Sequence, residues 1–177
     1  MSTTTWVIDP IHSDVQFKIK HLVISSVTGA FNQFEGSATA TGEDFDQVDA
    51  NFKIDVKSID TKNADRDNHL RTSDFFDADI HPEISFTSTD WEKLGDGEFA
   101  LKGELTLKGV TKPVILKAEF GGIEKDPYGN IKAGFEVSGK INRKEFGLTY
   151  DAVTETGGLV LGDEIKLISN IQLAKQA

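Results

Sequence analysis

Histidine is the residue type in this sequence best suited to catalysis or metal binding. The four histidines are His12, His21, His69 and His81. No two of them have the i, i+4 spacing by which a zinc protease presents its ligands on a helix, and the chain has no cysteine. His12 lies near Asp9 and could in principle share a metal with His21, but such histidines more often bind backbone groups. We therefore expect neither a metal nor a cofactor.

No other set of residues forms a recognisable catalytic group. Ser, His and Asp are all present, but the G-x-S-x-G turn of the serine hydrolases is absent. The pair Gly121-Gly122 lies in a strand context rather than between a strand and a helix, so it predicts no phosphate-binding loop. The sequence thus predicts a protein that is not an enzyme.

The segment 58–88 is unusual because it is dense in Asp, Arg and His and carries two adjacent rings, Phe75 and Phe76. Two interpretations are open. In one, Arg66 and Arg71 pair with nearby carboxylates and close one end of the fold. The carboxylates in question are Asp60, Asp65 and Asp67. In the other, the same polar groups surround an opening and contact the head of a ligand.

Length and composition limit the classes of protein further. The 177 residues fit a single domain spanning 1–177. The chain has 29 acidic and 19 basic residues, and its net charge of −10 argues against a nucleic-acid partner, because phosphate binding needs concentrated Lys and Arg. Phe outnumbers the other aromatics, with 12 Phe against 2 Trp and 2 Tyr. A core so rich in apolar rings either packs solid or surrounds something apolar.

The N-terminal sequence and the apolar runs bear on localisation. Residues 1–10, MSTTTWVIDP, have neither the basic nor the apolar region of a secretory signal. No apolar run approaches the roughly 18 residues of a membrane-spanning helix. We expect a cytoplasmic protein without an integral membrane segment, or a periplasmic one if a leader has been removed.

Apolar and polar residues alternate along most of the chain, as in strands with one buried face. The pattern is clearest over 99–107, where Phe99, Leu101, Leu105 and Leu107 share one face. Similar runs cover 14–20, 51–57, 114–120, 132–141 and 165–173. Further strands are expected near 84–91 and 27–41, the latter interrupted by Gly29 and Gly36. Residues 63–71 are polar and predict a short helix or ordered loop.

These runs predict an all-β fold of about eight antiparallel strands, as a barrel or a sandwich. Long strands with one buried face favour the barrel, since closure removes exposed strand edges. An eight-stranded barrel is just wide enough either to be filled by side chains or to hold one small ligand. The pattern alone leaves both states of the interior open.

Six stretches of the sequence also resemble a known family. They are DPIHSDVQFKIKHL at 9–22, TGAFNQFEG at 28–36, SIDTKNADRDNHLRTSDFFDADIHPEISFTS at 58–88, GELTLKGVTKPV at 103–114, INRKEFGL at 141–148 and GDEIKLISNIQL at 162–173. They resemble the YceI-like family of bacterial polyisoprenoid-binding proteins. The resemblance implies an extended, lipocalin-like barrel of eight antiparallel strands around a hydrophobic tunnel. It implies that the tunnel carries or stores a polyisoprenoid such as a prenyl quinone, or a fatty-acyl lipid, and it is compatible with a homodimer.

The resemblance also assigns residues to the tunnel. Its wall would comprise Phe17, Ile19, Phe31, Phe34, Phe52, Ile54, Phe75, Phe76, Phe86, Leu105, Leu107, Phe120 and Phe135. Arg66, His69 and Arg143 lie inside the motifs and are assigned to the head-group end or to sealing of the barrel. Two alternative functions stay open: an enzyme that modifies an isoprenoid lipid, with His69 or His21 as base, and a stress-response interaction module whose barrel is solid.

Overall fold

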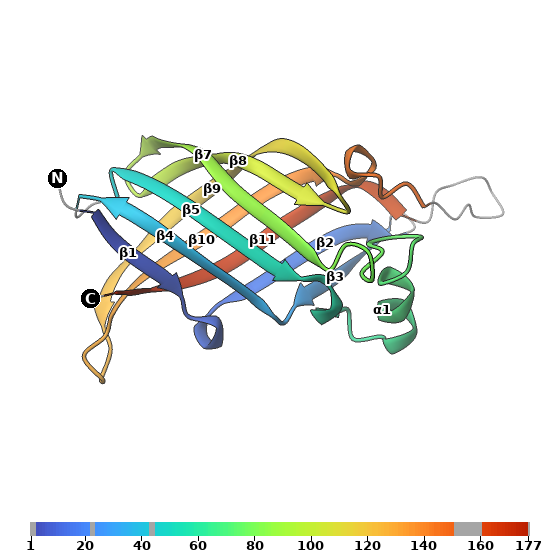
Figure 1. Ribbon diagram of the computed structural model, residues 1–177, viewed down its shortest axis with the longest axis horizontal. Coiled ribbons are helices and arrows are strands. Elements are labelled where there is room, and N and C mark those ends of the chain that lie inside the picture. Colours follow the sequence, from blue (N-terminus) through green and yellow to red (C-terminus); the bar gives the residue numbers. More distant parts are fainter. Residues whose placement is uncertain (1–2, 22–23, 43–44, 151–160, 177) are drawn as a thin grey trace.

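The alternating segments of the sequence form the strands of one closed antiparallel sheet (Figure 1). The computed structural model describes residues 3–21, 24–42, 45–150 and 161–176. Its strands are β1 (Thr3–Ile8), β2 (Asp14–His21), β3 (Ser25–Phe31), β4 (Phe34–Thr41), β5 (Gln47–Asp55), β6 (Ile59–Asp60), β7 (Glu83–Gly95), β8 (Glu98–Leu107), β9 (Val110–Lys125), β10 (Ile131–Asn142) and β11 (Leu161–Lys175). The order β1-β4-β5-β7-β8-β9-β10-β11 closes because β11 pairs with β1. The predicted eight-stranded antiparallel barrel is confirmed.

Two of the eight barrel strands are bent and continue through a break. β11 pairs with β2 through residues 161–170 and with β1 through residues 173–175. β1 and β2 therefore act as one strand, interrupted by the 3₁₀ helix η1 (Pro10–His12). β3 and β4 are likewise one bent strand, and their break lies at Asn32 and Gln33.

The position of the second break differs from the prediction, which placed interruptions at Gly29 and Gly36. Both glycines lie inside strands. A Cβ at Gly29 would overlap the ring of Phe17, and a Cβ at Gly36 would lie 2.7 Å from Cδ1 of Ile8. These glycines thus make room for inward-facing side chains rather than ending a strand.

Two of the long hairpins turn at a glycine. Gly97 turns β7 into β8, and Gly129 turns β9 into β10, with φ of 69° and 87° that favour glycine. In the second turn the Asp126 Oδ1 accepts hydrogen bonds from the backbone N–H of Tyr128 and of Asn130. Side-chain capping and glycine together fix the register of these long strands.

Residues 58–82 of the segment 58–88 lie across one end of the barrel, opposite the end that holds both termini, and the rest begins the wall strand β7 (Figure 1). After the 3₁₀ helix η2 (Val56–Ser58) and β6, helix α1 (Ala64–Leu70) begins at Asn63, whose side chain accepts from the N–H of Arg66 at 3.0 Å. The short helix predicted near 63–71 is confirmed. Within the described residues, no helix is long and apolar enough to span a membrane.

Candidate functional site

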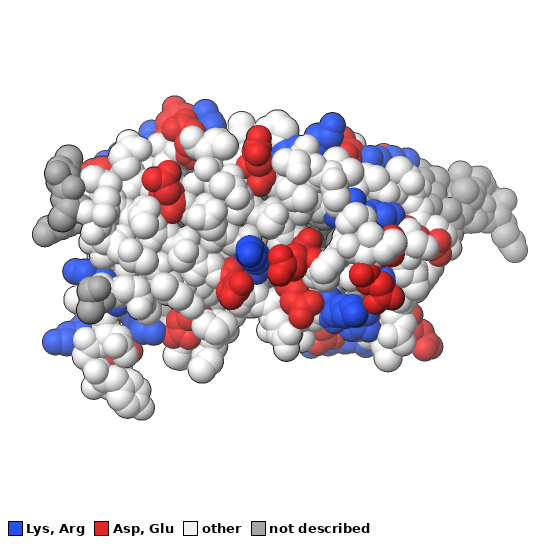
Figure 2. All heavy atoms as spheres, viewed as in Figure 1, with Lys and Arg blue, Asp and Glu red and all other residues white. Residues whose placement is uncertain are grey.

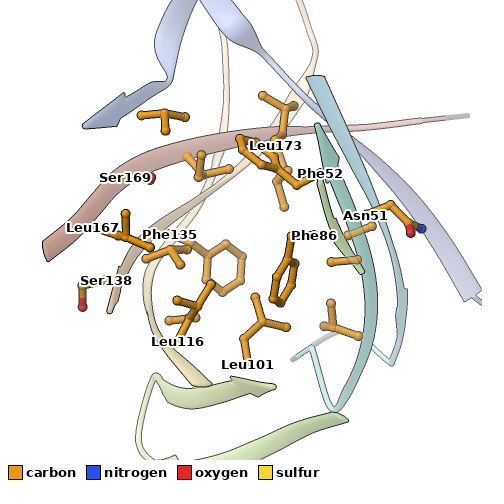
Figure 3. A pocket seen from close by; sticks show the side chains of 18 of the residues that line it. Asn51, Phe52, Phe86, Leu101, Leu116, Phe135, Ser138, Leu167, Ser169 and Leu173 are labelled. Atoms are coloured by element: carbon orange, nitrogen blue, oxygen red, sulfur yellow. The ribbon is translucent and has the colours of Figure 1, made fainter. Parts of the chain in front are cut away.

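The barrel encloses a cavity of about 180 Å³. The rings of Phe86 and Phe135 project into it, with Leu101 and Leu116 below them in the view of Figure 3. Among the described residues, none that lines the cavity is charged, and the polar ones are Gln16, Ser37, Asn51, Ser138 and Ser169. The Asn51 and Ser138 side chains point away from its centre (Figure 3). Such a lining suits a hydrocarbon and disfavours a charge, since a buried charge without a partner is costly.

Aromatic rings fill the barrel at the end near the termini. Phe45, in the loop between β4 and β5, is 2 % exposed and turns its side chain inward. Its ring centroid lies 5.3 Å from that of Trp6, 5.4 Å from Phe120 and 5.1 Å from Phe135. The Trp91 Nε1–H donates to the carbonyl oxygen of Phe45 at 2.8 Å, which ties this loop to β7.

A second aromatic group fills the end beneath α1. The Phe31 ring lies 5.5 Å from Phe17 and meets Phe76 edge-on at 6.0 Å. Phe75 and Phe146 are buried in the same core. The cavity therefore occupies the middle of the barrel, with rings packed at both ends.

Comparison with known proteins identifies this architecture. The sequence profile of the YceI-like domain matches residues 6–173. The chain belongs to the YceI-like family. A UPF0312 protein of Staphylococcus epidermidis is 39% identical over 167 residues, which cover 94% of this chain and 95% of the relative.

Solved structures of similar proteins have the same fold. The crystal structure of a Campylobacter jejuni YceI protein has 34% sequence identity and a TM-score of 0.77, and the match covers 89% of this chain and 90% of that one. A polyisoprenoid-binding domain from Saccharophagus degradans matches with a TM-score of 0.70 over 97% of this chain and 98% of its own. At 14% identity, the latter likeness concerns the fold alone.

The cavity of this YceI-like barrel includes only part of the wall predicted from the sequence. Predicted residues that line it are Phe52, Ile54, Phe86, Leu105 and Phe135. Predicted residues that lie outside its lining are Phe17, Ile19, Phe31, Phe34, Phe75, Phe76, Leu107 and Phe120. Several of the latter belong to the two end groups of rings. The prediction included them because alternation tells which face of a strand is buried but not how far along the barrel axis a residue lies.

Several cavity residues were not among those predicted. Leu101, Leu116 and Leu167 share the inward phase of their strands, and the alternation of apolar residues could have found them. Phe45 belongs to a loop, where no periodicity exists, so the sequence carried no signal for its inward position. Trp91 follows a register shift in β7 between Ser88 and Asp90, which changes the alternation.

The predicted pairing of Arg66 and Arg71 with Asp60, Asp65 or Asp67 is wrong. Arg66 donates from Nε to Oγ1 and from Nη2 to the carbonyl oxygen of Thr61, at 2.8 and 2.7 Å. Arg71 donates to the carbonyl oxygens of Lys57 and Ile59, both at 3.1 Å. The backbone around β6 has few sheet partners, and the planar guanidinium groups satisfy its carbonyl oxygens.

The remaining polar residues assigned to the family's head-group end or to sealing also have partners within the fold. His69 Nε2 lies 2.8 Å from Oδ2 of Asp74, and its ring packs edge-on against Phe75 and Tyr150. Arg143 is 1 % exposed and donates to the carbonyl oxygens of Gly162, Leu148 and Tyr150. In the described structure, Arg66, His69 and Arg143 all lie outside the cavity lining.

Described histidines and carboxylates pair within the fold instead of gathering into a metal site. His12 Nδ1 lies 2.8 Å from Oδ2 of Asp9, and the same oxygen accepts from Nζ of Lys132 at 2.7 Å. These hydrogen bonds, from Lys132 first and then from His12, hold the pKa of the Asp9 carboxyl well below its usual range. Among the residues that the structure describes, no three His, Asp or Glu side chains form a group able to hold a metal ion. The side chain of His21 lies outside the described part.

Proposed function

We propose that this YceI-like protein binds a polyisoprenoid, such as a prenyl quinone, or another long-chain amphiphile, with its chain in the barrel cavity, for carriage or storage. The observation that carries the proposal is the uncharged cavity of about 180 Å³ in the middle of the barrel. The fold supports it, because a structural neighbour is described as a polyisoprenoid-binding domain. Each CH₂ group that leaves water contributes about 0.8 kcal/mol, so a few isoprene units supply a large part of the binding free energy.

The exterior suits a carrier of apolar cargo in water. Acidic and basic side chains are interspersed over the face shown in Figure 2, and the net charge is −10. A charge of this size keeps a protein dispersed, whereas the lining of the cavity inside the barrel is mostly apolar. Burial of the chain rather than charge then drives its binding, so the affinity for a neutral prenyl chain is expected to vary little with salt.

Binding fits the structure better than catalysis or a solid interaction module. Two described His–Asp pairs, His69–Asp74 and His12–Asp9, each have a nitrogen 2.8 Å from a carboxylate oxygen, and both lie outside the cavity lining. A base must reach the proton that it abstracts within hydrogen-bonding distance. A solid barrel would leave no space between the two end groups of rings, whereas this one leaves about 180 Å³.

Organic extraction of the purified protein, followed by mass spectrometry, tests the proposal. We expect a prenyl lipid or another long-chain amphiphile in the extract. In parallel, the delipidated protein is titrated with a prenyl quinone while tryptophan fluorescence is recorded, because Trp91 lines the cavity. The variant Trp6→Phe assigns the signal to Trp91. An empty extract together with no saturable quenching would refute the proposed function.

A further inference from the structure

The barrel wall contains a gap between β9 and β10. Their register runs from Ile131 opposite Lys125 to Ser138 opposite Lys117 and ends there. Beyond this point the first half of β9 pairs with β8, and the last residues of β10 pair with β11. A groove of about 400 Å³ lies on the outer face of these strands, at the place where the pairing of β9 with β10 ends.

The groove meets the cavity at this gap. Leu116, Ser138 and Leu167 line both of them and lie on the same side of the cavity in Figure 3. A Cβ at Gly139 would lie 2.5 Å from Cδ2 of Leu116, so the Leu116 side chain occupies the space that Gly139 leaves open. The flexible Leu116 side chain, with Ser138 and Leu167 beside it, thus lies between the interior and the outer groove.

Access at this gap matters because rings fill both ends of the barrel. Phe45 and its neighbours occupy the end near the termini, and Phe31 with Phe76 occupies the end beneath α1. The cavity also approaches the outer residues Ser37 and Asn51 of β4 and β5, near Ile8. The gap beside Leu116 differs from that second position because a separate groove continues it on the outside.

The groove combines an apolar rim with positive charge. Leu94 and Ile115, at 55 % and 65 % exposed, are its exposed large apolar residues. Its charged residues are Lys117, Lys140 and Lys166, and no described Asp or Glu lines it. The carboxylates of Glu98 and Glu119 lie 3.6 and 3.0 Å from Nζ of Lys117 and offset its charge, so Lys140 and Lys166 supply the positive charge of the groove.

Lys140 and Lys166 lie in a row of like charges across neighbouring strands. Lys140 of β10 lies directly opposite Lys166 of β11, and Lys166 lies opposite Lys18 of β2. Like charges opposite each other on neighbouring strands are destabilising. Lys140 has a carboxylate of Glu164 at 3.8 Å, whereas Lys18 and Lys166 make no ion pair with any described residue. An anion bound over this row would relieve the repulsion.

We infer that the groove between β9 and β10 holds the anionic head of a bound amphiphile, a phosphate or a carboxylate, while its chain passes Leu116 into the cavity. This inference rests on the proposed function and adds to it the class of head group and the path of the chain. The Lys140 and Lys166 ammonium groups bind the anion, and the Ser138 hydroxyl lies beside them in the same groove. The apolar rim covers the first carbons of the chain.

Two probes with one chain test the head-group class: geranylgeranyl phosphate and geranylgeraniol, titrated into the delipidated wild-type protein. We expect the phosphate to bind about tenfold more tightly at low ionic strength, and the preference to shrink as salt screens the lysines. The double variant Lys140→Gln/Lys166→Gln loses this preference and keeps its affinity for the alcohol. The control variant Lys112→Gln/Lys125→Gln has the same change of charge outside the groove and is expected to keep the preference for the phosphate. Inorganic phosphate alone is expected not to bind, since it lacks the chain.

The outcomes separate the two proposals. Equal affinities of the wild-type protein for phosphate and alcohol would overturn the anionic head group and leave the lipid-binding function standing. Binding of neither probe would overturn the proposed function itself. Saturable binding of inorganic phosphate at the same affinity would show a simple anion site rather than a head-group site.

Exchange rates test the path of the chain. Leu116→Ala widens the gap and is expected to speed the release of bound geranylgeraniol several-fold, with a smaller change in affinity. Val114→Ala is the matched control, because Val114 lines the cavity from the same strand but not the groove. Ile8→Ala widens the second position, where the cavity approaches Ser37 and Asn51. Faster release in Ile8→Ala with unchanged release in Leu116→Ala would place the passage there and overturn the inferred path.

Discussion

The indole N–H of Trp91 donates a hydrogen bond of 2.8 Å to the carbonyl oxygen of Phe45, which lies 46 residues earlier in the chain. The Trp91 ring also stacks on Phe99 at 4.4 Å. A strand of the barrel wall thereby holds the loop whose Phe45 side chain fills the end near the termini. The backbone of Phe45 is thus held by one buried hydrogen bond within an otherwise apolar group of rings.

Replacement of Trp91 by Phe is expected to lower the free energy of unfolding by about 1–3 kcal/mol beyond the loss of ring area, because it leaves the buried carbonyl oxygen of Phe45 without its donor. Urea unfolding measures the change. Trp6→Phe is the control, since Trp6 is equally buried and packs on Phe45 through its ring alone in the described structure. Equal losses in the two variants would contradict a role for the hydrogen bond.

The ion pair of Asp9 with Lys132 joins the break between β1 and β2 to strand β10. Both side chains are mostly buried, at 14 % and 15 % exposed, and His12 adds a second hydrogen bond to the carboxylate. Because the folded-state pKa of Asp9 is lowered, its stabilisation is fully present above the ordinary Asp pKa of about 4. It is lost as the pH falls below that value toward the lowered pKa.

Asp9→Asn is therefore expected to destabilise the protein by about 1–3 kcal/mol at pH 7 and by progressively less below about pH 4. Asparagine keeps an oxygen that can accept from the N–H of Ile11 and so preserves the cap of η1. Urea unfolding at a series of pH values gives the difference from wild type. Asp49→Asn, at an exposed position on β5, is the control and is expected to show little effect. If the difference in unfolding free energy between wild type and Asp9→Asn grew on acidification, the ionised Asp9 carboxylate could not be its cause.

Gly103 lies where a side chain has no room. A Cβ there would overlap the ring of Phe86 and lie 2.5 Å from the carbonyl oxygen of Thr87, and the latter is backbone that cannot move aside cheaply. Gly103→Ala is expected to lower the free energy of unfolding by about 1–3 kcal/mol. In Gly134→Ala, the new methyl group meets no atom within 4 Å, and the expected change is within about 0.5 kcal/mol. Thermal unfolding of both variants is the measurement, and similar losses in both would refute the steric argument.

The sequence was sufficient for most of the strands and their buried faces, but it did not predict β1 or the register shift in β7. The alternation through Leu105 and Phe135 placed both residues inward, and both line the cavity. Phe17 has the same kind of pattern but packs on Phe31 at the α1 end. Position along the barrel axis depends on strand register, and a two-residue shift in register leaves the same residues facing inward, so a pattern of period two does not detect it.

Other parts of the site depend on contacts that are remote in sequence. Phe45 enters the barrel from a loop, held by Trp91. The groove exists because β9 and β10 stop pairing at Lys117 and Ser138, although the alternation continues through both strands. Neither feature has a local signal, since each results from how far the neighbouring strands extend.

Ala118 offers a direct test of whether the cavity holds the ligand. It is 1 % exposed and lines the cavity from β9, so Ala118→Leu fills part of the space without displacing packed side chains. We expect this variant to fold with a stability close to that of wild type and to bind a prenyl quinone at least about tenfold more weakly, since a loss of about 1.4 kcal/mol suffices for tenfold.

Ala133→Leu is the matched control, because Ala133 is 0 % exposed on the neighbouring strand β10 but lies outside the cavity lining. The same added carbons have no space there, so the variant is expected to lose about 1–3 kcal/mol of stability. Fluorescence titration and urea unfolding of both variants separate the two effects. If Ala118→Leu bound the quinone as tightly as wild type does, the chain could not lie beside Ala118. If it were destabilised as much as Ala133→Leu, the space beside Ala118 would already be filled by protein atoms.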